Sequence, residues 1–398
     1  MKKTLVAIAA LAATGAMAQS AVSIEGIMDA GYQSIKNFGG QQTNQVGQSG
    51  ARTTTFKFKG TEDLGGGQTA NFQFEVQPSI IAGNGNAYNA TSPAIAAGTI
   101  GNGAVQSTST ASAQSGLVGK GQSFVGLKDA KYGEVQFGTI NTGTFGAFAA
   151  VSQLGTGVGT GYGSGLTFGD MTRVESSMAY FSPNIAGFDF RVQQGTNNDS
   201  QWGTTSTSTN QGVVLRRPRV LDMGAGYTNG PLAVKYGRLE STTTANEATA
   251  ATANVKTTTQ LLGAAYDMGV AKLSAATGTI KSEGPGVTAP IDNKLALYAV
   301  SVPFGANRVI AQYGSHAANG KSASYNTGLK SKTTGLAFER DLSKRTFVYV
   351  RYEKTDLAAF SAKSYVVNGA AITSSANWGT AGIDSQRTIT TVGLSHAF

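Results

Sequence analysis

The sequence contains no cysteine, which excludes a disulfide framework and any metal site built from thiolates. It contains only two histidines, His316 and His396, and no motif sets either beside a nucleophile. Glycine-rich stretches at 155–165 and 314–322 lack the spacing and the strand-to-helix context of nucleotide-binding loops. These absences predict a protein that is not an enzyme and that needs no cofactor.

Long hydrophobic runs are also missing, although 40% of the residues are hydrophobic. The apolar run at 5–13 is too short to span a bilayer as a helix. It follows Lys2 and Lys3 and precedes a small-x-small cleavage pattern at 16–18, so residues 1–18 match a secretory signal peptide that is removed on export. No later segment reaches the length of a transmembrane helix, and a membrane location would therefore require strands.

Charged residues are few and mixed in sign. They make up 13% of the chain, and 31 Lys and Arg against 22 Asp and Glu give a formal net charge of +9. The basic residues are scattered along the chain and form no dense stripe, which argues against a nucleic-acid partner.

A two-residue periodicity, typical of strands with two different faces, runs from residue 21 to the C-terminus. The chain ends on such a strand, in which Gly393, Ser395 and Ala397 alternate with larger side chains. In a membrane barrel the last strand pairs with the first, and this pairing removes the free edge of the sheet. We therefore expect the final strand to close a barrel through its apolar face, at Val392, Leu394 and Phe398.

Short and long connections between these segments alternate. Short ones, rich in Gly, Pro, Asn and Asp, lie at 60–67, 128–133, 183–187, 228–231, 267–269, 303–307 and 341–344. Long ones lie near 37–50, 77–121, 140–172, 194–216, 239–256, 279–293, 315–331 and 354–386. These fifteen connections join sixteen strands. The alternation predicts an all-β fold, a transmembrane 16-stranded antiparallel barrel with short periplasmic turns and long extracellular loops. A soluble β-solenoid or adhesin, the alternative, would not need it.

The two faces of the strands predict which side chains line the pore. A lysine or arginine that faces lipid near the midplane costs about 2–4 kcal/mol, so the polar face should point into a water-filled lumen. Segments near Val125 and Leu295 are too uniformly apolar to assign. The predicted pore-lining residues on the strands are Lys57, Lys59, Glu75, Arg173, Glu175, Arg191, Lys235, Arg308 and Arg351.

Several segments match a known family in order along the chain. They are 21–31, 56–67 (FKFKGTEDLGGG), 125–127, 178–183, 342–346 and 392–398. With these segments the sequence resembles the trimeric general porins of Gram-negative bacteria, especially the beta-proteobacterial type. The resemblance implies one barrel over residues 19–398, a homotrimer in the outer membrane, and a third long loop, residues 140–172, folded into the lumen as a constriction.

The chain departs from the pattern of this family where charge matters. Constriction loops of general porins commonly carry several carboxylates, whereas this loop carries only Asp170. Thr139, Ser395 and Ala397 also stand where relatives often have basic residues.

The predicted inward charges balance, eight basic against eight acidic. The set adds Lys272, Glu25, Asp29, Glu134, Asp189, Asp222 and Glu339 to the strand residues named above. Strong selectivity needs a ring of one sign at close quarters. We therefore expect weak charge selectivity, with a slight anion preference if Lys57 and Lys59 approach the constriction.

The predicted function is passive diffusion of ions and small hydrophilic solutes across the outer membrane. A solute-specific channel and a surface adhesin or receptor barrel are the alternatives. Outer-membrane lipid is a further expected partner, because Arg216, Arg217 and Arg219 lie at the outer end of a strand, where they could bind lipopolysaccharide phosphates. Simple solvation of these three charges explains them equally well.

Overall fold

The computed structural model describes residues 21–36, 42–78, 80–81, 121–160, 172–195, 219–243, 255–284, 291–318, 329–356, 365–367, 370–372 and 386–398. The expected signal peptide at 1–18, Asp170, Arg216 and Arg217 lie outside these residues. Among the described residues, no helix combines the length and the apolar character needed to cross a membrane.

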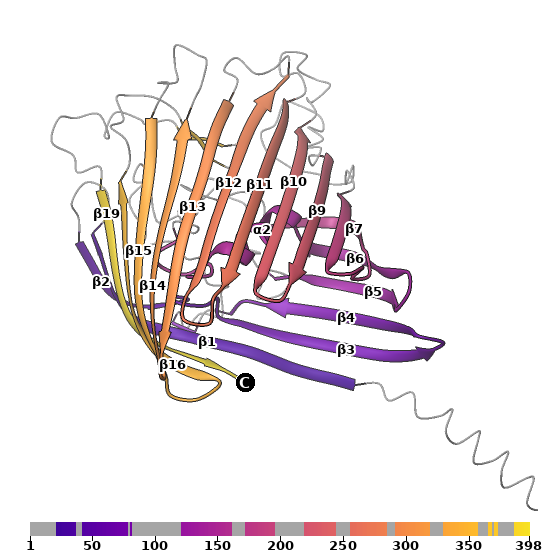
Figure 1. The fold of residues 1–398 in the computed structure, drawn as a ribbon, viewed down its shortest axis with the longest axis horizontal. Helices are drawn as coiled ribbons and strands as arrows, with labels where there is room; N and C mark the ends of the chain where they lie inside the picture. Colours follow the sequence, from indigo (N-terminus) through magenta and orange to yellow (C-terminus); the bar gives the residue numbers. More distant parts are fainter. Residues whose placement is uncertain are drawn as a thin grey trace, which may run out of the picture.

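One antiparallel sheet of 17 strands forms the wall of the molecule (Figure 1). Its strands are β1 (Ala21–Lys36), β2 (Gln42–Gln48), β3 (Thr55–Gly65), β4 (Gln68–Val76), β5 (Ser123–Asp129), β6 (Gly133–Asn141), β7 (Arg173–Phe181), β8 (Phe188–Gly195), β9 (Arg219–Asn229), β10 (Leu232–Thr243), β11 (Val255–Asp267), β12 (Lys272–Glu283), β13 (Ile291–Phe304), β14 (Asn307–Ala318), β15 (Leu329–Asp341), β16 (Thr346–Asp356) and β19 (Gln386–Ala397). A helix, α2 (Gly143–Val151), and a separate hairpin of β17 (Tyr365–Val367) and β18 (Ala370–Ile372) complete the described elements.

Sixteen strand positions surround the lumen, because β2 and β3 share one of them. The C-terminal half of β1 pairs with β2, from Lys36↔Gln42 to Ala30↔Gln48, and its N-terminal half pairs with β3, starting at Ile27↔Thr55. The predicted sixteen-stranded barrel is confirmed. One boundary is corrected, since residues 42–48 of the expected loop 37–50 form a strand.

The barrel closes through β19, which pairs with β16 on one side and with β1 on the other. Val392 lies opposite Tyr32, and Leu394 lies opposite Ala30. Beyond the strand, Phe398 exchanges two backbone hydrogen bonds of 3.1 Å with Gly26. The seam is therefore hydrogen-bonded to the last residue.

All seven expected short turns join neighbouring strands at one end of the barrel. The turn between β3 and β4 shows why its glycines are needed: Gly65, Gly66 and Gly67 have φ of 79°, 62° and 85°, which L side chains rarely adopt. Asp63 accepts a hydrogen bond from the Gly65 amide at 2.9 Å. Local chemistry thus fixes this turn.

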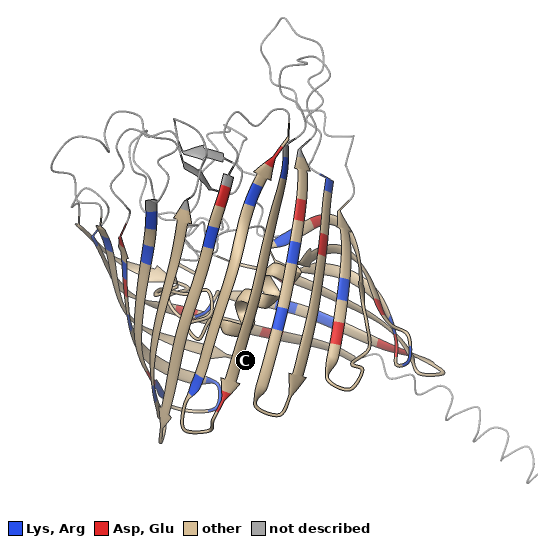
Figure 2. Cartoon of the chain, turned by 45° about the horizontal axis from the view of Figure 1, so that its top comes forward, with Lys and Arg blue, Asp and Glu red and all other residues tan. Residues whose placement is uncertain are grey.

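Apolar side chains cover the outside and polar ones the inside, as predicted for a barrel in lipid. Large exposed side chains of the outward face include Phe58, Phe72, Phe188, Phe190, Val192, Val309, Val348, Val350, Val392 and Leu394. Inward neighbours such as Gln193, Gln312 and Thr333 are buried. Charged residues are distributed along the strands (Figure 2). His316 was expected in a loop, but it lies in β14 as a buried inward side chain.

Candidate functional site

The candidate site is the lumen, where the chain leaves β6 and runs inward as α2 and residues 152–160 (Figure 1). Thr142 caps the helix by accepting a hydrogen bond from the Phe145 amide at 3.1 Å. The first helical amide, of Gly143, donates to the Asp222 carboxylate of β9 at 2.7 Å. A carboxylate at this end also suits the helix dipole.

One apolar face of α2 packs on an apolar patch of the inner wall. Phe148 and Val151 are buried in a cluster with Leu261, Leu295 and Leu297 of β11 and β13. This contact explains why the sequence near Leu295 is uniformly apolar. Both faces of β13 are covered, one by the expected lipid and the other by the helix.

Wall glycines let the inward segment approach closely. A Cβ atom on Gly237 would lie 2.4 Å from the Gly143 carbonyl carbon, and one on Gly335 would lie 2.0 Å from the carbonyl oxygen of Gly159. Such distances do not occur between real Cβ atoms and backbone, so these wall positions accept glycine alone without a shift of the loop.

Polar side chains of the wall hold residues 152–160 by their backbone. The Gln312 amide oxygen of β14 accepts hydrogen bonds from the amides of Gln153 (3.1 Å) and Leu154 (3.4 Å). The Glu353 carboxylate of β16 accepts one from the Gly159 amide at 2.9 Å. These side chains satisfy backbone groups that have left the sheet.

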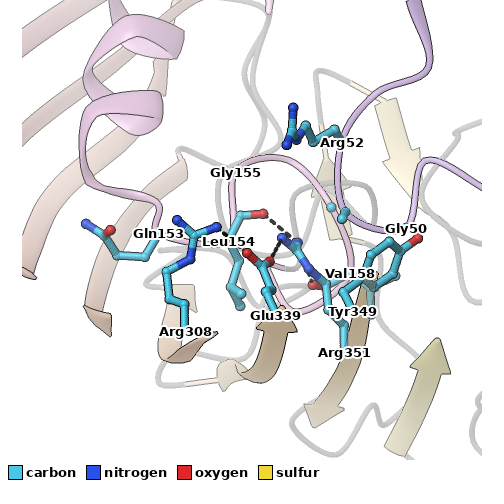
Figure 3. Close-up of polar contacts among 12 residues, drawn as sticks. Gly50, Arg52, Gln153, Leu154, Gly155, Val158, Arg308, Glu339, Tyr349 and Arg351 are labelled. Atoms are coloured by element: carbon cyan, nitrogen blue, oxygen red, sulfur yellow. Dashed lines mark hydrogen bonds and ion pairs between the residues drawn. The ribbon is translucent and has the colours of Figure 1, made fainter. Parts of the chain in front are cut away.

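Arg351 joins this segment to the buried acid of β15 (Figure 3). Its guanidinium donates to the Leu154 carbonyl at 2.8 Å and to the Glu339 carboxylate at 2.6 Å. Arg308 binds the other oxygen of Glu339. The side chain of Glu339 is 1% exposed and that of Arg308 is 46% exposed. The acid is thus hidden beneath two cations, one of which reaches the water.

The same asymmetry recurs at a second shared acid. Glu75 lies 3.9 Å from both Lys57 and Arg173. Its side chain is 9% exposed, against 32% for Lys57 and 24% for Arg173. Here too one buried carboxylate serves two more exposed cations.

Other predicted pore-lining residues form one-to-one pairs. Arg191 lies 3.4 Å from Asp222, whose side chain is fully buried. Lys59 pairs with Glu25 at 2.6 Å, and Lys235 pairs with Asp189 at 2.5 Å. In these last two pairs the acid is at least as exposed as the lysine, so each pair is close to neutral toward the lumen.

Two predictions stay predictions: that Lys57 and Lys59 approach the constriction, and that Glu175 lines the pore. Within the described residues, no hydrogen bond or ion pair joins Lys57 or Lys59 to residues 142–160; the link nearest to them along the chain is a 3.3 Å contact between the hydroxyls of Thr53 and Thr156. Glu175 is exposed near the start of β7.

Arg52 is a lumen residue that the sequence patterns did not reveal. It lies on residues 49–54, between β2 and β3, and its guanidinium carbon lies 4.4 Å from the centre of the Phe347 ring. The alternating pattern of the strand that follows it starts only at Phe56, so counting along strands misses Arg52. The one available signal is a lone arginine directly before a predicted strand. Figure 3 shows Arg52 near Arg308 and Arg351.

Nothing in the described part of the chain gathers three or more His, Cys, Asp or Glu side chains in a way that could hold a metal ion.

Comparison with known proteins gives a consistent result. A family model described as Gram-negative porin matches residues 4–358. The outer membrane porin protein 32 of Delftia acidovorans is 29% identical over 88% of this chain and 88% of its own. Among solved structures, an anion-selective porin from Comamonas acidovorans has a TM-score of 0.69 and 24% identity, covering 96% of this chain and all of its own. The trimer form of OmpT, an outer membrane protein of Vibrio cholerae, has a TM-score of 0.62 and 14% identity over 95% of this chain and 99% of its own.

The close contact at Gly335 predicts that a larger side chain there widens the pore without unfolding the barrel. Gly335→Val is expected to displace residues 152–160, because the new side chain meets the Gly159 backbone. Overpacking of this kind costs about 1–3 kcal/mol, and we expect it to be relieved by movement of the loop, which raises single-channel conductance. Leu336→Val on the outward face is the control and should leave conductance unchanged. Equal conductance of the two variants would contradict the prediction.

Proposed function

The chain belongs to the Gram-negative porin family, and we propose that its lumen has a weak preference for anions over cations. The protein is a passive channel of the bacterial outer membrane, through which ions and small hydrophilic solutes diffuse down their gradients. The proposed anion preference rests on how charges are shared and exposed in the lumen.

The observation that carries this proposal is that two lumen carboxylates are buried and that each is shared by two cations. Glu339 serves Arg308 and Arg351, and Glu75 serves Lys57 and Arg173. Each group of three therefore carries a net positive charge, with the cations nearer to the water. An ion in the channel would meet a positive field, although the inward charges predicted from the sequence are equal in number.

Residues 140–172 would place this field where the channel is narrow. Their described part, 140–160, lies against the inner wall and is fixed there by α2, Gln312, Arg351 and Glu353. No Asp or Glu occurs within it. We propose that this segment constricts the lumen beside Arg308 without adding negative charge.

Replacing both Arg52 and Arg308 with Gln should move the chloride-to-potassium permeability ratio toward one. A unit charge about 8 Å from an ion changes its energy by about 0.5 kcal/mol in water, with opposite sign for anions and cations. At 0.1 M salt the Debye length is about 10 Å, and screening roughly halves this energy, so each removed cation lowers the ratio by about twofold. Reversal potentials across a salt gradient in planar bilayers measure the ratio.

Arg238→Gln is the matched control, because Arg238 lies on the outward face and pairs with Glu240. Its ratio should equal that of the native protein. A cation-preferring native channel, or an unchanged ratio in the double variant, would refute the proposed selectivity.

We propose that the channel is a homotrimer. A structural neighbour of the same fold is described as a trimer form, and the outward face of β3–β6 exposes Phe58, Phe72, Val125 and Phe137, which suit burial against another barrel. Single insertions into a planar bilayer should then show three equal conductance steps. One step per insertion would indicate a monomer.

We propose that phosphates of outer-leaflet lipid bind a three-lysine patch, Lys294, Lys330 and Lys332, on the outer wall. All three are exposed and lie at the long-loop ends of β13 and β15, on the outward face. Lys294 and Lys330 both lie opposite Ala317 of β14, one on each side. Strands lie about 4.8 Å apart, so the two lysine backbones are about 10 Å apart, close enough to share a phosphorylated headgroup.

Lysines outnumber carboxylates at this patch. Among the described residues, no carboxylate forms an ion pair with the three lysines; Asp356 lies opposite Lys332 but pairs with Lys354 at 3.6 Å. The patch thus retains the positive charge that lipopolysaccharide phosphates would neutralise.

Replacing the three lysines with Gln should weaken lipopolysaccharide binding. Each lysine near a charged lipid surface contributes about 1 kcal/mol, so the triple variant should bind roughly a hundredfold more weakly. Lys344→Gln with Arg345→Gln, in the periplasmic turn between β15 and β16, is the control. Binding of purified lipopolysaccharide to detergent-solubilised barrels gives the measurement, and equal affinities would leave the lysines as solvated surface charges.

A further inference from the structure

A gap in the pairing of β1 marks an unusual feature of the wall. Ile27 pairs with Thr55 of β3, and Ala30 pairs with Gln48 of β2. Between these two rungs β1 advances by three residues, whereas its partner advances by seven. Residues 49–54 therefore leave the sheet and enter the lumen, and their backbone groups need other partners.

Asp29 of β1 lies in this gap and provides partners with its own backbone. Its carbonyl accepts hydrogen bonds from the Ser49 amide (2.9 Å) and the Thr54 hydroxyl (3.1 Å). Its amide donates to the Thr54 hydroxyl at 3.2 Å. Both ends of the inward segment are thus attached to one residue.

The carboxylate of Asp29 binds the middle of the same segment. It accepts hydrogen bonds from the amides of Gly50 (2.8 Å), Ala51 (3.3 Å) and Arg52 (3.0 Å) and from the Tyr349 hydroxyl (2.7 Å). Asp29 is 0% exposed and Tyr349 is 1% exposed. Within the described residues no Lys or Arg forms an ion pair with Asp29, so three amides of the segment and one phenol stabilise its negative charge by hydrogen bonds.

The segment held by Asp29 has two contacts with the candidate constriction. The Gly50 carbonyl accepts a hydrogen bond from the Val158 amide at 2.8 Å, which fixes the end of the constriction loop. The hydroxyls of Thr53 and Thr156, 3.3 Å apart, form the other contact. Arg52 of the same segment lies with its guanidinium over the ring of Phe347 in the wall strand β16. A shift of residues 49–52 would move the loop and the arginine together.

We propose that Asp29 is a positioning residue of the pore: its buried carboxylate folds residues 49–54 into the lumen and thereby sets both the place of Arg52 and the closure of the constriction loop. Asp29 itself does not touch the permeating ion. The lumen is then narrowed from two sides, by residues 142–160 and by residues 49–54. This inference rests on the proposed anion preference, because Arg52 is one of its carriers.

Chemistry explains why a carboxylate is used. Three successive amides that point at one spot form a concave donor set, which favours an anion with two acceptor oxygens. Asparagine has nearly the same shape, but its NH2 group would face one or more of these donors. Asp29→Asn therefore tests the charge and the acceptor pattern with little change in volume.

Asp29→Asn should raise single-channel conductance and remove most of the part of the anion preference that Arg52→Gln removes. Loss of the carboxylate charge by itself would favour anions, so a lower preference reports displacement of Arg52. Arg52→Gln alone should lower the preference and leave the loop in place. Reversal potentials and conductances of the two variants in planar bilayers provide the comparison. Tyr349→Phe and Thr54→Val, which each remove milder contacts to Asp29, should change both quantities in the same direction by less.

A cross-link can show whether Asp29→Asn acts by releasing the inward segments or by destabilising the whole barrel. The chain has no cysteine, and the hydroxyls of Thr53 and Thr156 lie 3.3 Å apart, so Thr53→Cys with Thr156→Cys should form a disulfide between the two inward segments. In the Asp29→Asn background, oxidation should restore conductance and selectivity toward native values, and reduction should abolish this rescue. A barrel that is merely less stable would not respond in this way.

The outcomes distinguish failure of the role of Asp29 from failure of the proposed anion preference. If Arg52→Gln changes selectivity but Asp29→Asn, Tyr349→Phe and Thr54→Val do not, Asp29 is not a positioning residue and the anion preference stands. If Arg52→Gln has no effect, the contribution of Arg52 to the preference fails, and conductance alone then decides the role of Asp29. If Asp29→Asn yields no folded barrel, the two milder variants decide, and native conductance in both overturns the inference.

Discussion

The hydrogen-bonding requirement of backbone in lipid is the constraint on which the rest of the structure depends. No water in the hydrocarbon region can satisfy an unpaired amide or carbonyl, so a strand-built membrane protein must close its sheet. Here β19 joins β1 to β16, and two bonds between Gly26 and Phe398 extend the seam to the last residue. Closure creates a lumen, and the lumen allows irregular backbone at membrane depth.

Two irregular segments use this freedom, and wall side chains satisfy both. Residues 142–160 are bound by Asp222, Gln312, Arg351 and Glu353, and residues 49–54 by Asp29. In each case a polar side chain of a strand takes the place of the strand partner that the segment has left. Apolar packing adds to this at α2, where Leu295 and Leu297 turn inward, and in smaller clusters around Leu154 and Ala51. The polar lining is thus scaffold as well as channel surface.

Strand number, turn positions and the two faces could be predicted from the sequence, because a two-residue period and Gly-rich turns are local signals. Which face of β13 points into the lumen could not be predicted, because its inner face is apolar where it packs against α2. Residues 42–48 and Arg52 were missed for a related reason. The segment that follows β2 is bound by Asp29 of β1 and by Tyr349 through Asp29, and no local pattern brings these residues together. Many inward charges could likewise be predicted from the sequence, but the extent to which each is buried could not.

Burial of the acids follows from their structural use. Asp29, Asp222 and Glu353 each accept backbone amide bonds from an inward segment, at Gly50, Gly143 and Gly159. A carboxylate that binds an amide in the wall is covered by the segment that it holds, so ions in the water cannot contact it directly. Long arginine side chains such as that of Arg308 can bind an acid and still reach the water. The proposed anion preference follows from this use of the acids: those that build the constriction are covered, whereas a cation such as Arg308 stays exposed to solutes.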